Sequence, residues 1–313
     1  MNELLQALIR GAGLGGMYAT IAVGFVIIFR ATGVLNFAQP VFMIFGTLFS
    51  YYLVDSAGLP FPLAAVAAVA AVAAIATVTE RIAMRPMVGR PVFSATLVTV
   101  GLFAAGIVLV HKLFGAKVIT SGDPWGLSNF CLGGHRPADS VVAAACVGGV
   151  TVNYTDIFKV VAALTVIAAL VLWLERSRYG LAMRAAAMDQ ETAMAQGVDV
   201  GRVFALSWAL AGALAAVGGI LLGTAPGGVE AAALLIALKA LPAIIIGGLD
   251  SLYGALAGAM IVGLAEALTK TYQPDVAPWL GANFDVVMPY VLMFAVLLIR
   301  PHGLFGAKEV QRV

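Results

Sequence analysis

The amino-acid sequence predicts an all-α fold, a polytopic transmembrane helical bundle of about eight to ten spans, some of them broken or re-entrant. Of its 313 residues, 62% are hydrophobic and only 11% are charged, whereas soluble domains carry about 25% charged residues. The mean hydropathy is +1.00. No stretch has the composition of a separate soluble domain, so we treat residues 1–313 as a single transmembrane domain.

Nine apolar runs approach the roughly 20 residues that a helix needs to cross the hydrocarbon core. The first run follows Arg10 and lacks a small-residue cleavage site, so we expect a retained span rather than a signal peptide. The last three runs are short or interrupted. The runs cover residues 11–29, 34–54, 59–79, 91–110, 157–174, 203–223, 231–249, 252–268 and 285–299.

Basic residues indicate how the spans are oriented. Arginines cluster in three segments between or after the runs, at residues 81–90, 176–202 and 300–312. By the positive-inside rule these segments are cytoplasmic, which puts the segment 115–156 outside. The N-terminus is then outside if the run 34–54 spans fully and inside if that run is re-entrant, and both arrangements stay open.

Small residues recur at every fourth position in the first, sixth and eighth runs. At helical spacing each set forms a flat stripe against which a neighbouring helix can pack closely. The stripes consist of Gly11, Gly15 and Ala19, of Ala211, Ala215, Gly219 and Gly223, and of Ala255, Ala259, Gly263 and Ala267.

The stretch GVLNFAQP, residues 33–40, places two amides and a proline between the first two runs. In one interpretation Asn36 and Gln39 are interfacial, and Pro40 lies in the first turn of a helix that begins near residue 38 or 39. In the other, the stretch is the non-helical start of a broken span, in which the amides satisfy freed backbone groups or line a pathway.

Few polar side chains fall inside the runs. Lys239 and Glu266 are charged, and a charge at depth is paired or lies in a watery cavity. Both lie near the ends of their runs, so snorkelling to the interface is an equal alternative. We expect Thr99 to bond its own helix rather than a solute.

Cys131 and Cys146 both fall in the expected external segment, where an oxidising compartment would allow a disulfide. Cys146 lies in VVAAACVGGV, however, which suits a short buried helix in which a free thiol acts as a small hydrophobe. Two cysteines alone are a weak disulfide framework, so we favour free thiols.

The segment 175–202 mixes charge with good helix formers, and we expect a helix from Gly180 to Gln196 that ends at Gly197. Leu181 and Met188 belong to a modest amphipathic pattern with a seven-residue repeat. Such a helix either lies on the membrane surface or docks into a groove of a partner.

Several kinds of chemistry find no motif in the sequence. It contains no phosphate-cradling glycine loop, no paired Cys-x-x-Cys and no nucleophile elbow. We therefore expect no enzyme acting alone, no metal and no cofactor bound by this chain. The formal net charge of +2 is too small to suggest a nucleic-acid partner.

Four stretches in order carry a resemblance to a known family: GVLNFAQPVFMIFG, RYGLAMRAAAMDQETAMAQGVDVGRV, KALPAIIIGGLDSLYGALAG and IRPHGLFG. Together they resemble the branched-chain amino acid permease family of ABC importers, the LivH type. The resemblance covers nearly the whole chain, and the segment 115–156 matches least well.

The resemblance implies a multi-pass subunit of the bacterial inner membrane, surrounded by lipid, with the fold of the vitamin-importer type of ABC permease. It would work with a second, LivM-like permease, with two ATPase subunits that use ATP and Mg, and with an external substrate-binding protein. Whether the permeases pair as identical or different chains stays open. Alternating access would move branched-chain or related small amino acids. The alternatives are urea, short amides or small carboxylates, or a self-sufficient secondary transporter.

The resemblance also suggests site residues. The cytoplasmic segment looks like the coupling segment that docks into the ATPase, and NFAQP is similar to the motif Asn-Phe-Ala-Gln/His-Gly, with proline in place of glycine. Proline fixes φ near −65°, so this hinge would be stiffer. We therefore favour the broken span. The expected coupling residues are Arg184, Ala185, Asp189, Ala193 and Gly197, and the expected solute-pathway residues are Asn36, Phe37, Gln39, Pro40 and Glu266.

Overall fold

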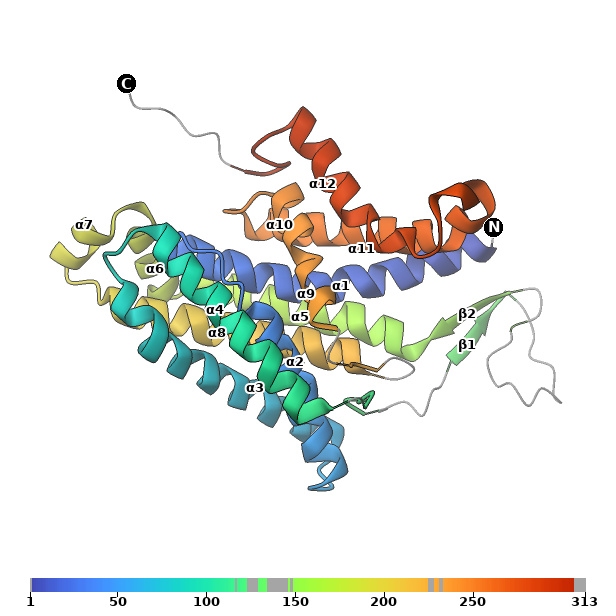
Figure 1. Ribbon diagram of the computed structural model, residues 1–313, viewed down its shortest axis with the longest axis horizontal. Helices are drawn as coiled ribbons and strands as arrows, with labels where there is room; N and C mark the ends of the chain where they lie inside the picture. The colour runs from blue at the N-terminus through green and yellow to red at the C-terminus, as the bar shows by residue number, and fades with distance from the viewer. Residues whose placement is uncertain are drawn as a thin grey trace.

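The computed structural model describes residues 2–115, 117–122, 129–133, 146, 149–224, 228–230 and 233–306. Helices dominate these residues, as predicted (Figure 1). The α-helices are α1 (Asn2–Thr32), α2 (Gln39–Asp55), α3 (Phe61–Thr79), α4 (Val92–Phe114), α5 (Tyr154–Arg176), α6 (Arg178–Met188), α7 (Gln190–Ala195), α8 (Val200–Gly223), α9 (Leu234–Leu238), α10 (Ala240–Gly247), α11 (Leu252–Val276) and α12 (Met288–Ile299). Shorter turns are η1 (Glu80–Met84), η2 (Arg85–Met87), η4 (Pro278–Leu280) and η5 (Phe284–Val286), and the strands are β1 (Asn129–Leu132) and β2 (Val150–Asn153).

Helix α1 forms the centre of the bundle and packs against α5, α8, α10 and α11. The predicted small-residue stripes meet there: a Cβ added to Gly263 of α11 would overlap the backbone of Gly15, and one added to Gly11 would lie 2.9 Å from the Cα of Leu264. The stripes of α1 and α11 are thus confirmed as a close helix–helix contact. Because these glycines lack a Cβ atom, the two helix backbones can approach closely. The hydrophobic effect does not drive helices together in lipid, so van der Waals contact between the backbones stabilises the pair.

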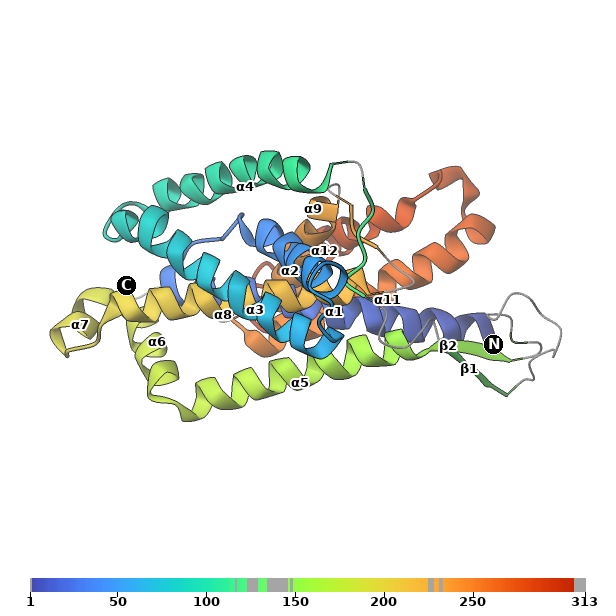
Figure 2. The ribbon, with the colours of Figure 1, turned by 90° about the horizontal axis from the view of Figure 1, so that it is seen from below.

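The elongated bundle has two distinct ends (Figures 1 and 2). One, which we call the basic end, carries α6, α7 and the connection between α3 and α4, where the arginines of segments 81–90 and 176–202 lie. The other, the hairpin end, carries β1, β2 and the start of α1. If the basic end is cytoplasmic, the N-terminal end of α1 is external.

Six of the described helices are long and apolar enough to span a membrane, fewer than the nine predicted runs. The remaining runs form shorter pieces: the second is helical only from Gln39, the seventh is divided at Lys239 between α9 and α10, and the ninth forms α12 of 12 residues. The expectation of broken spans is met at the second and seventh runs.

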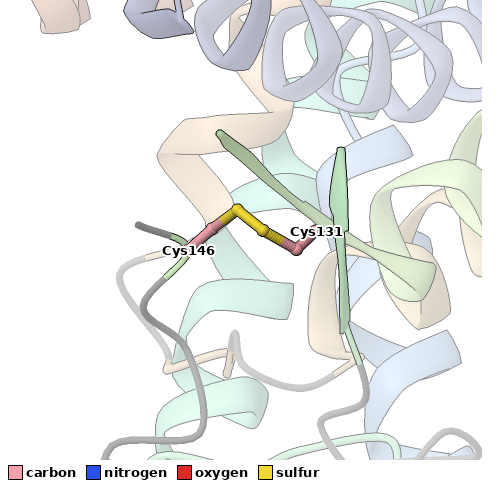
Figure 3. Close-up of a disulfide and its surroundings, with 2 residues drawn as sticks. All are labelled: Cys131 and Cys146. Carbon is pink, nitrogen blue, oxygen red and sulfur yellow. A yellow bond between two sulfur atoms is a disulfide. The ribbon is translucent and has the colours of Figure 1, made fainter. Parts of the chain in front are cut away.

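A disulfide joins Cys131 to Cys146 at the hairpin end (Figure 3). Strands β1 and β2 pair antiparallel, with Cys131 opposite Thr151. The two Cα atoms are 5.6 Å apart, within the usual range for a disulfide. Our preference for free thiols was therefore wrong. Most of VVAAACVGGV lies outside the described residues, and Cys146 itself is not helical.

Candidate functional site

The chain breaks its helical course between α1 and α2, and both interpretations of GVLNFAQP predicted a helix that starts near residue 38 or 39. Gly33 adopts a φ of +71°, and its N–H donates to the carbonyl of Phe29 at 2.7 Å, which closes α1. Helix α2 then begins at Gln39, with Pro40 in its first turn. Asn36 Oδ1 accepts a hydrogen bond from the N–H of Ala38 at 3.0 Å. The amide therefore satisfies a backbone group that the break has freed.

Asn36 and Gln39 form one buried polar group, in which each side chain is 0% exposed. Asn36 Nδ2 donates to Gln39 Oε1 at 3.2 Å, and Gln39 Nε2 donates to the carbonyl of Ala211 in α8 at 3.0 Å. A Cβ on Gly24 of α1 would overlap Gln39 Nε2, so the missing side chain of Gly24 makes room for the amide. The start of α2 is thus fixed to α8 inside the bundle.

Thr99 of α4 supports the same break from the opposite side. Its hydroxyl lies 2.8 Å from the carbonyl of Thr96 and 3.1 Å from that of Leu35, and the N–H of Phe37 donates to it at 3.2 Å. The expected bond to its own helix is confirmed, but the contacts with residues 35 and 37 were not predicted. Phe37 is half-buried, whereas Asn36, Gln39 and Pro40 are buried.

Glu266 belongs to a second buried polar group. Its Oε1 accepts from Lys239 Nζ at 2.6 Å, and its Oε2 accepts from the Tyr18 hydroxyl at 2.8 Å. The three residues are 7%, 6% and 1% exposed, so the snorkelling alternative for Lys239 and Glu266 was wrong and the paired alternative is confirmed. Tyr18 lies six residues before Gly24 on α1, a rise of about 9 Å, so Glu266 lies at a different depth from Gln39.

The lysine of this group stands at a helix break. Lys239 is the last residue before α10 and follows α9 directly. Because a charge inside the membrane is unfavourable unless paired, Glu266 holds this junction against α11 and α1. The pair stabilises the seventh, broken segment of the bundle.

The segment 175–202 forms two short helices, α6 and α7, rather than the single helix predicted from Gly180 to Gln196. Asp189 separates them because it is extended, with φ −161°, and its carboxylate caps α7. Asp189 Oδ1 accepts from the N–H groups of Glu191 at 2.9 Å and Thr192 at 3.1 Å, and Oδ2 accepts from the Thr192 hydroxyl at 2.7 Å. The backbone and hydroxyl hydrogen bonds from Thr192 lower the pKa of Asp189.

Caps fix the other ends of the segment. Ser177 Oγ accepts from the N–H of Gly180 at 3.1 Å at the start of α6. Gly197 has a φ of +84° just after α7, so the prediction that it ends a helix is confirmed. Asp199 Oδ1 accepts from the N–H of Arg202 at 3.0 Å at the start of α8. The whole segment is therefore ordered by local hydrogen bonds that link α5 to α8.

Helices α6 and α7 bury one face and expose an apolar one. Met183, Ala186 and Ala193 are buried against the bundle. Leu181, Met188 and Met194 are 63%, 90% and 50% exposed, and the segment α6–α7 that carries them lies at the basic end (Figure 1). Soluble surfaces rarely expose large apolar side chains together without a partner.

The expected coupling residues lie at different places on this segment. Arg184, Asp189 and Gly197 are exposed, Ala185 is half-buried and Ala193 is buried. Arg184 Nη1 donates to the carbonyl of Leu174 at 3.5 Å, and it lines a cavity of about 420 Å³ with Arg30 and Asp250.

Within the described part of the chain, no cluster of three or more histidine, cysteine, aspartate or glutamate side chains could hold a metal ion.

Comparison with known sequences gives concordant matches. The family model described as "Branched-chain amino acid transport system / permease component" matches residues 7–297. BraD of Pseudomonas aeruginosa, a high-affinity branched-chain amino acid transport system permease protein, is 30% identical over 99% of this chain and 98% of its own. LivH of Escherichia coli is 28% identical over 99% and 97%. A probable LivH of Methanocaldococcus jannaschii is 29% identical over 94% and 90%.

A solved structure also matches across most of its length. The complex titled "PsaBC from Streptococcus pneumoniae in complex with Fab" covers 96% of this chain and 93% of the matched chain, with a TM-score of 0.49 and 16% identity.

Proposed function

The chain belongs to the family of branched-chain amino acid transport system permease components, and on that premise we propose that it is the membrane subunit of an ATP-driven importer for branched-chain or related small amino acids. It is a multi-pass membrane protein and a transport subunit rather than an enzyme. Its proposed location is the bacterial inner membrane. Its proposed partners are a second, LivM-like permease, two ATPase subunits that use ATP and Mg, and an external substrate-binding protein.

One observation carries the proposed link to the ATPases, namely the exposed apolar face of α6 and α7. Leu181, Met188 and Met194 are exposed on a segment that lies at the basic end, which the positive-inside rule makes cytoplasmic. The caps at Asp189 and Gly197 keep the segment rigid. A rigid apolar helical face suits docking into a groove of a partner better than a flexible loop does.

The connections of this segment support alternating access. Helix α5 precedes it and α8 follows it, so motion of α6 and α7 reaches two spans. Helix α8 is in turn bonded to the start of α2 through Gln39 and Ala211. A nucleotide-driven shift at the basic end would thereby reach the break at residues 33–38. The proposed pathway residues Asn36, Phe37, Gln39 and Pro40 all lie at or beside this break.

The solute assignment draws on the names of the relatives, which are branched-chain amino acid permease proteins. Urea, short amides and small carboxylates remain the alternatives. A secondary transporter finds less support, because its best candidate for a proton-binding carboxylate, Glu266, already accepts from Lys239 and Tyr18. For the same reason Glu266 has the weakest support among the proposed pathway residues.

Purification from the native membrane tests the proposal. We expect ATPase subunits and a second permease to copurify, and the reconstituted complex to take up leucine only with ATP inside and the binding protein outside. Uptake driven by a proton gradient in the absence of ATP, or reproducible purification without ATPase subunits, would instead favour the secondary transporter.

A further inference from the structure

A second acidic residue, Glu80, is buried at the basic end without a partner. Its side chain is 1% exposed, and among the described residues its two carboxylate oxygens are the buried side-chain atoms that lack a hydrogen-bond partner. Leaving a buried polar group unsatisfied is unfavourable by about 1–3 kcal/mol, and more for a charge. Both carboxylate oxygens of Glu266, by contrast, accept hydrogen bonds. The carboxylate of Glu80 therefore has the capacity to bind a hydrogen-bond donor.

The backbone around Glu80 departs from a regular helix. Glu80–Met84 forms the π-helical turn η1 directly after α3, and a 3₁₀ turn follows. Single π-helical turns such as η1 occur frequently at functional sites. Arginines lie close in sequence, but none forms an ion pair with Glu80 within the described residues. The guanidinium of Arg85 is directed toward α8, where a Cβ on Gly201 would lie 2.6 Å from Arg85 Nη2.

Glu80 lines a cavity of about 210 Å³ between η1, η2, α4, α8 and the link after α1. One wall is apolar and includes Met84, Met87, Phe204 and Trp208. Trp208 is fixed in place by an edge contact with Phe42, with ring centroids 6.2 Å apart. The cavity is many times larger than the space that one water molecule requires.

The polar lining of the cavity includes a positively charged residue in addition to the acidic Glu80. Arg90, which precedes α4, and Gln190, at the start of α7, line the same cavity as Glu80. A guanidinium group binds a carboxylate well, and a carboxylate binds an ammonium group well. An acid, a base and an apolar wall in one small cavity match the three parts of an aliphatic amino acid.

We propose that this cavity is a binding site for a zwitterionic amino acid with a small apolar side chain, in which Glu80 binds the ammonium group and Arg90 the carboxylate. The aliphatic side chain then packs against Met84, Met87 and Trp208. The site deepens the proposed function and rests on it for the solute class. It lies at the basic end, beside both the break at residues 33–38 and the segment α6–α7, so its ligand arrives from the cytoplasmic side.

Equilibrium binding to the full chain, purified with its copurifying subunits in lipid nanodiscs and without external binding protein, tests the site. The probes are radiolabelled leucine, 3-methylbutylamine, which lacks the carboxylate, and 4-methylpentanoate, which lacks the ammonium group. We expect leucine to bind most tightly and 4-methylpentanoate least. Glu80→Gln should weaken leucine binding by roughly 10- to 100-fold, the loss expected for a buried charged hydrogen bond.

Two variants keep the result interpretable. Glu80→Asp retains the charge and should keep part of the affinity, whereas Glu3→Gln removes an exposed charge at the hairpin end and should change nothing. Unchanged leucine binding in Glu80→Gln, or equally tight binding of 4-methylpentanoate, would overturn the proposal. Leucine uptake through the external binding protein is measured in the same preparation. Normal uptake with no Glu80-dependent binding refutes the site alone, whereas absent uptake refutes the proposed function.

Discussion

Gln39 at the start of α2 donates a hydrogen bond to the carbonyl of Ala211 in the middle of α8, with a distance of 3.0 Å between Nε2 and O. The two residues are 172 positions apart in the sequence and both are fully buried. This bond joins the broken second span to the helix that leaves the segment α6–α7. It makes the break at residues 33–38 a fixed structural element rather than a loose linker.

Replacement of Asn36 by leucine should impair transport without preventing assembly. The variant loses the bonds to Ala38 N–H and to Gln39 Oε1, and leaves buried groups unsatisfied at a cost of about 1–3 kcal/mol. Asn36→Ser is the matched control, because its uncharged hydroxyl can still accept from the N–H of Ala38. We expect reduced uptake in Asn36→Leu at normal yield of the assembled complex. Normal uptake would leave Asn36 as a helix cap with no part in the pathway.

The Lys239–Glu266 pair should be stabilising only as a pair. Glu266→Gln leaves Lys239 as an uncompensated buried charge, and we expect a loss of about 3–5 kcal/mol, seen as a lower Tm in detergent. The double variant Lys239→Met with Glu266→Leu removes both charges and should recover most of the stability. A loss in the double variant equal to the summed losses of Glu266→Leu alone and Lys239→Met alone would show that the two side chains act independently.

The cap on α7 should govern coupling to the ATPases. Asp189→Ala removes three hydrogen bonds to the carboxylate, and we expect the start of α7 to become less stable as a helix. ATPase stimulation by the loaded binding protein should fall, while Asp189→Asn, which also caps helices well, should retain it. Gly197→Ala forces a side chain into a φ of +84° and should act in the same direction. Unchanged stimulation in Asp189→Ala and Gly197→Ala would count against docking through this segment.

The pH dependence of this cap follows from the lowered pKa of Asp189. Because the folded pKa lies below the reference value of 3.8, the cap contributes stability above that value and loses it as the pH falls through the folded pKa. Between pH 6 and 8 the carboxylate stays ionised, so we expect the ratio of ATPase stimulation in wild type and Asp189→Asn to be constant. A ratio that changes across this interval would mean that Asp189 gains or loses a proton there.

Local features were predictable from the sequence and distant contacts were not. Asn36 caps Ala38 two residues away, and Gly197 ends α7 within its own turn, so neighbouring residue types were enough to anticipate both. The cap at Asp189 also had a local signal, because aspartate is a preferred N-cap residue, but the helical pattern on both sides concealed it.

The two buried polar groups depend on contacts between residues that are far apart in the sequence. Tyr18 and Glu266 are 248 positions apart, and no periodicity in either run indicates that they meet. Strands of four residues gave no alternation long enough to predict a hairpin, so the proximity of Cys131 and Cys146 was missed. Glu80 follows an alanine-rich run and was indistinguishable from an ordinary span end.

The disulfide at the hairpin end should stabilise the pairing of β1 and β2 and leave the bundle intact. Cys131 and Cys146 close a loop of 15 positions, for which the chain-entropy model gives about 3 kcal/mol. We expect Cys131→Ser to speed hydrogen exchange of the backbone amides in β1 and β2, because their pairing loses its covalent link. Exchange in the middle of α1 and in α11 should not change, since these helices are held together by close small-residue packing. Faster exchange in α1 as well would show that the hairpin and the bundle unfold together, and unchanged exchange in β1 and β2 would show that strand pairing alone holds the hairpin.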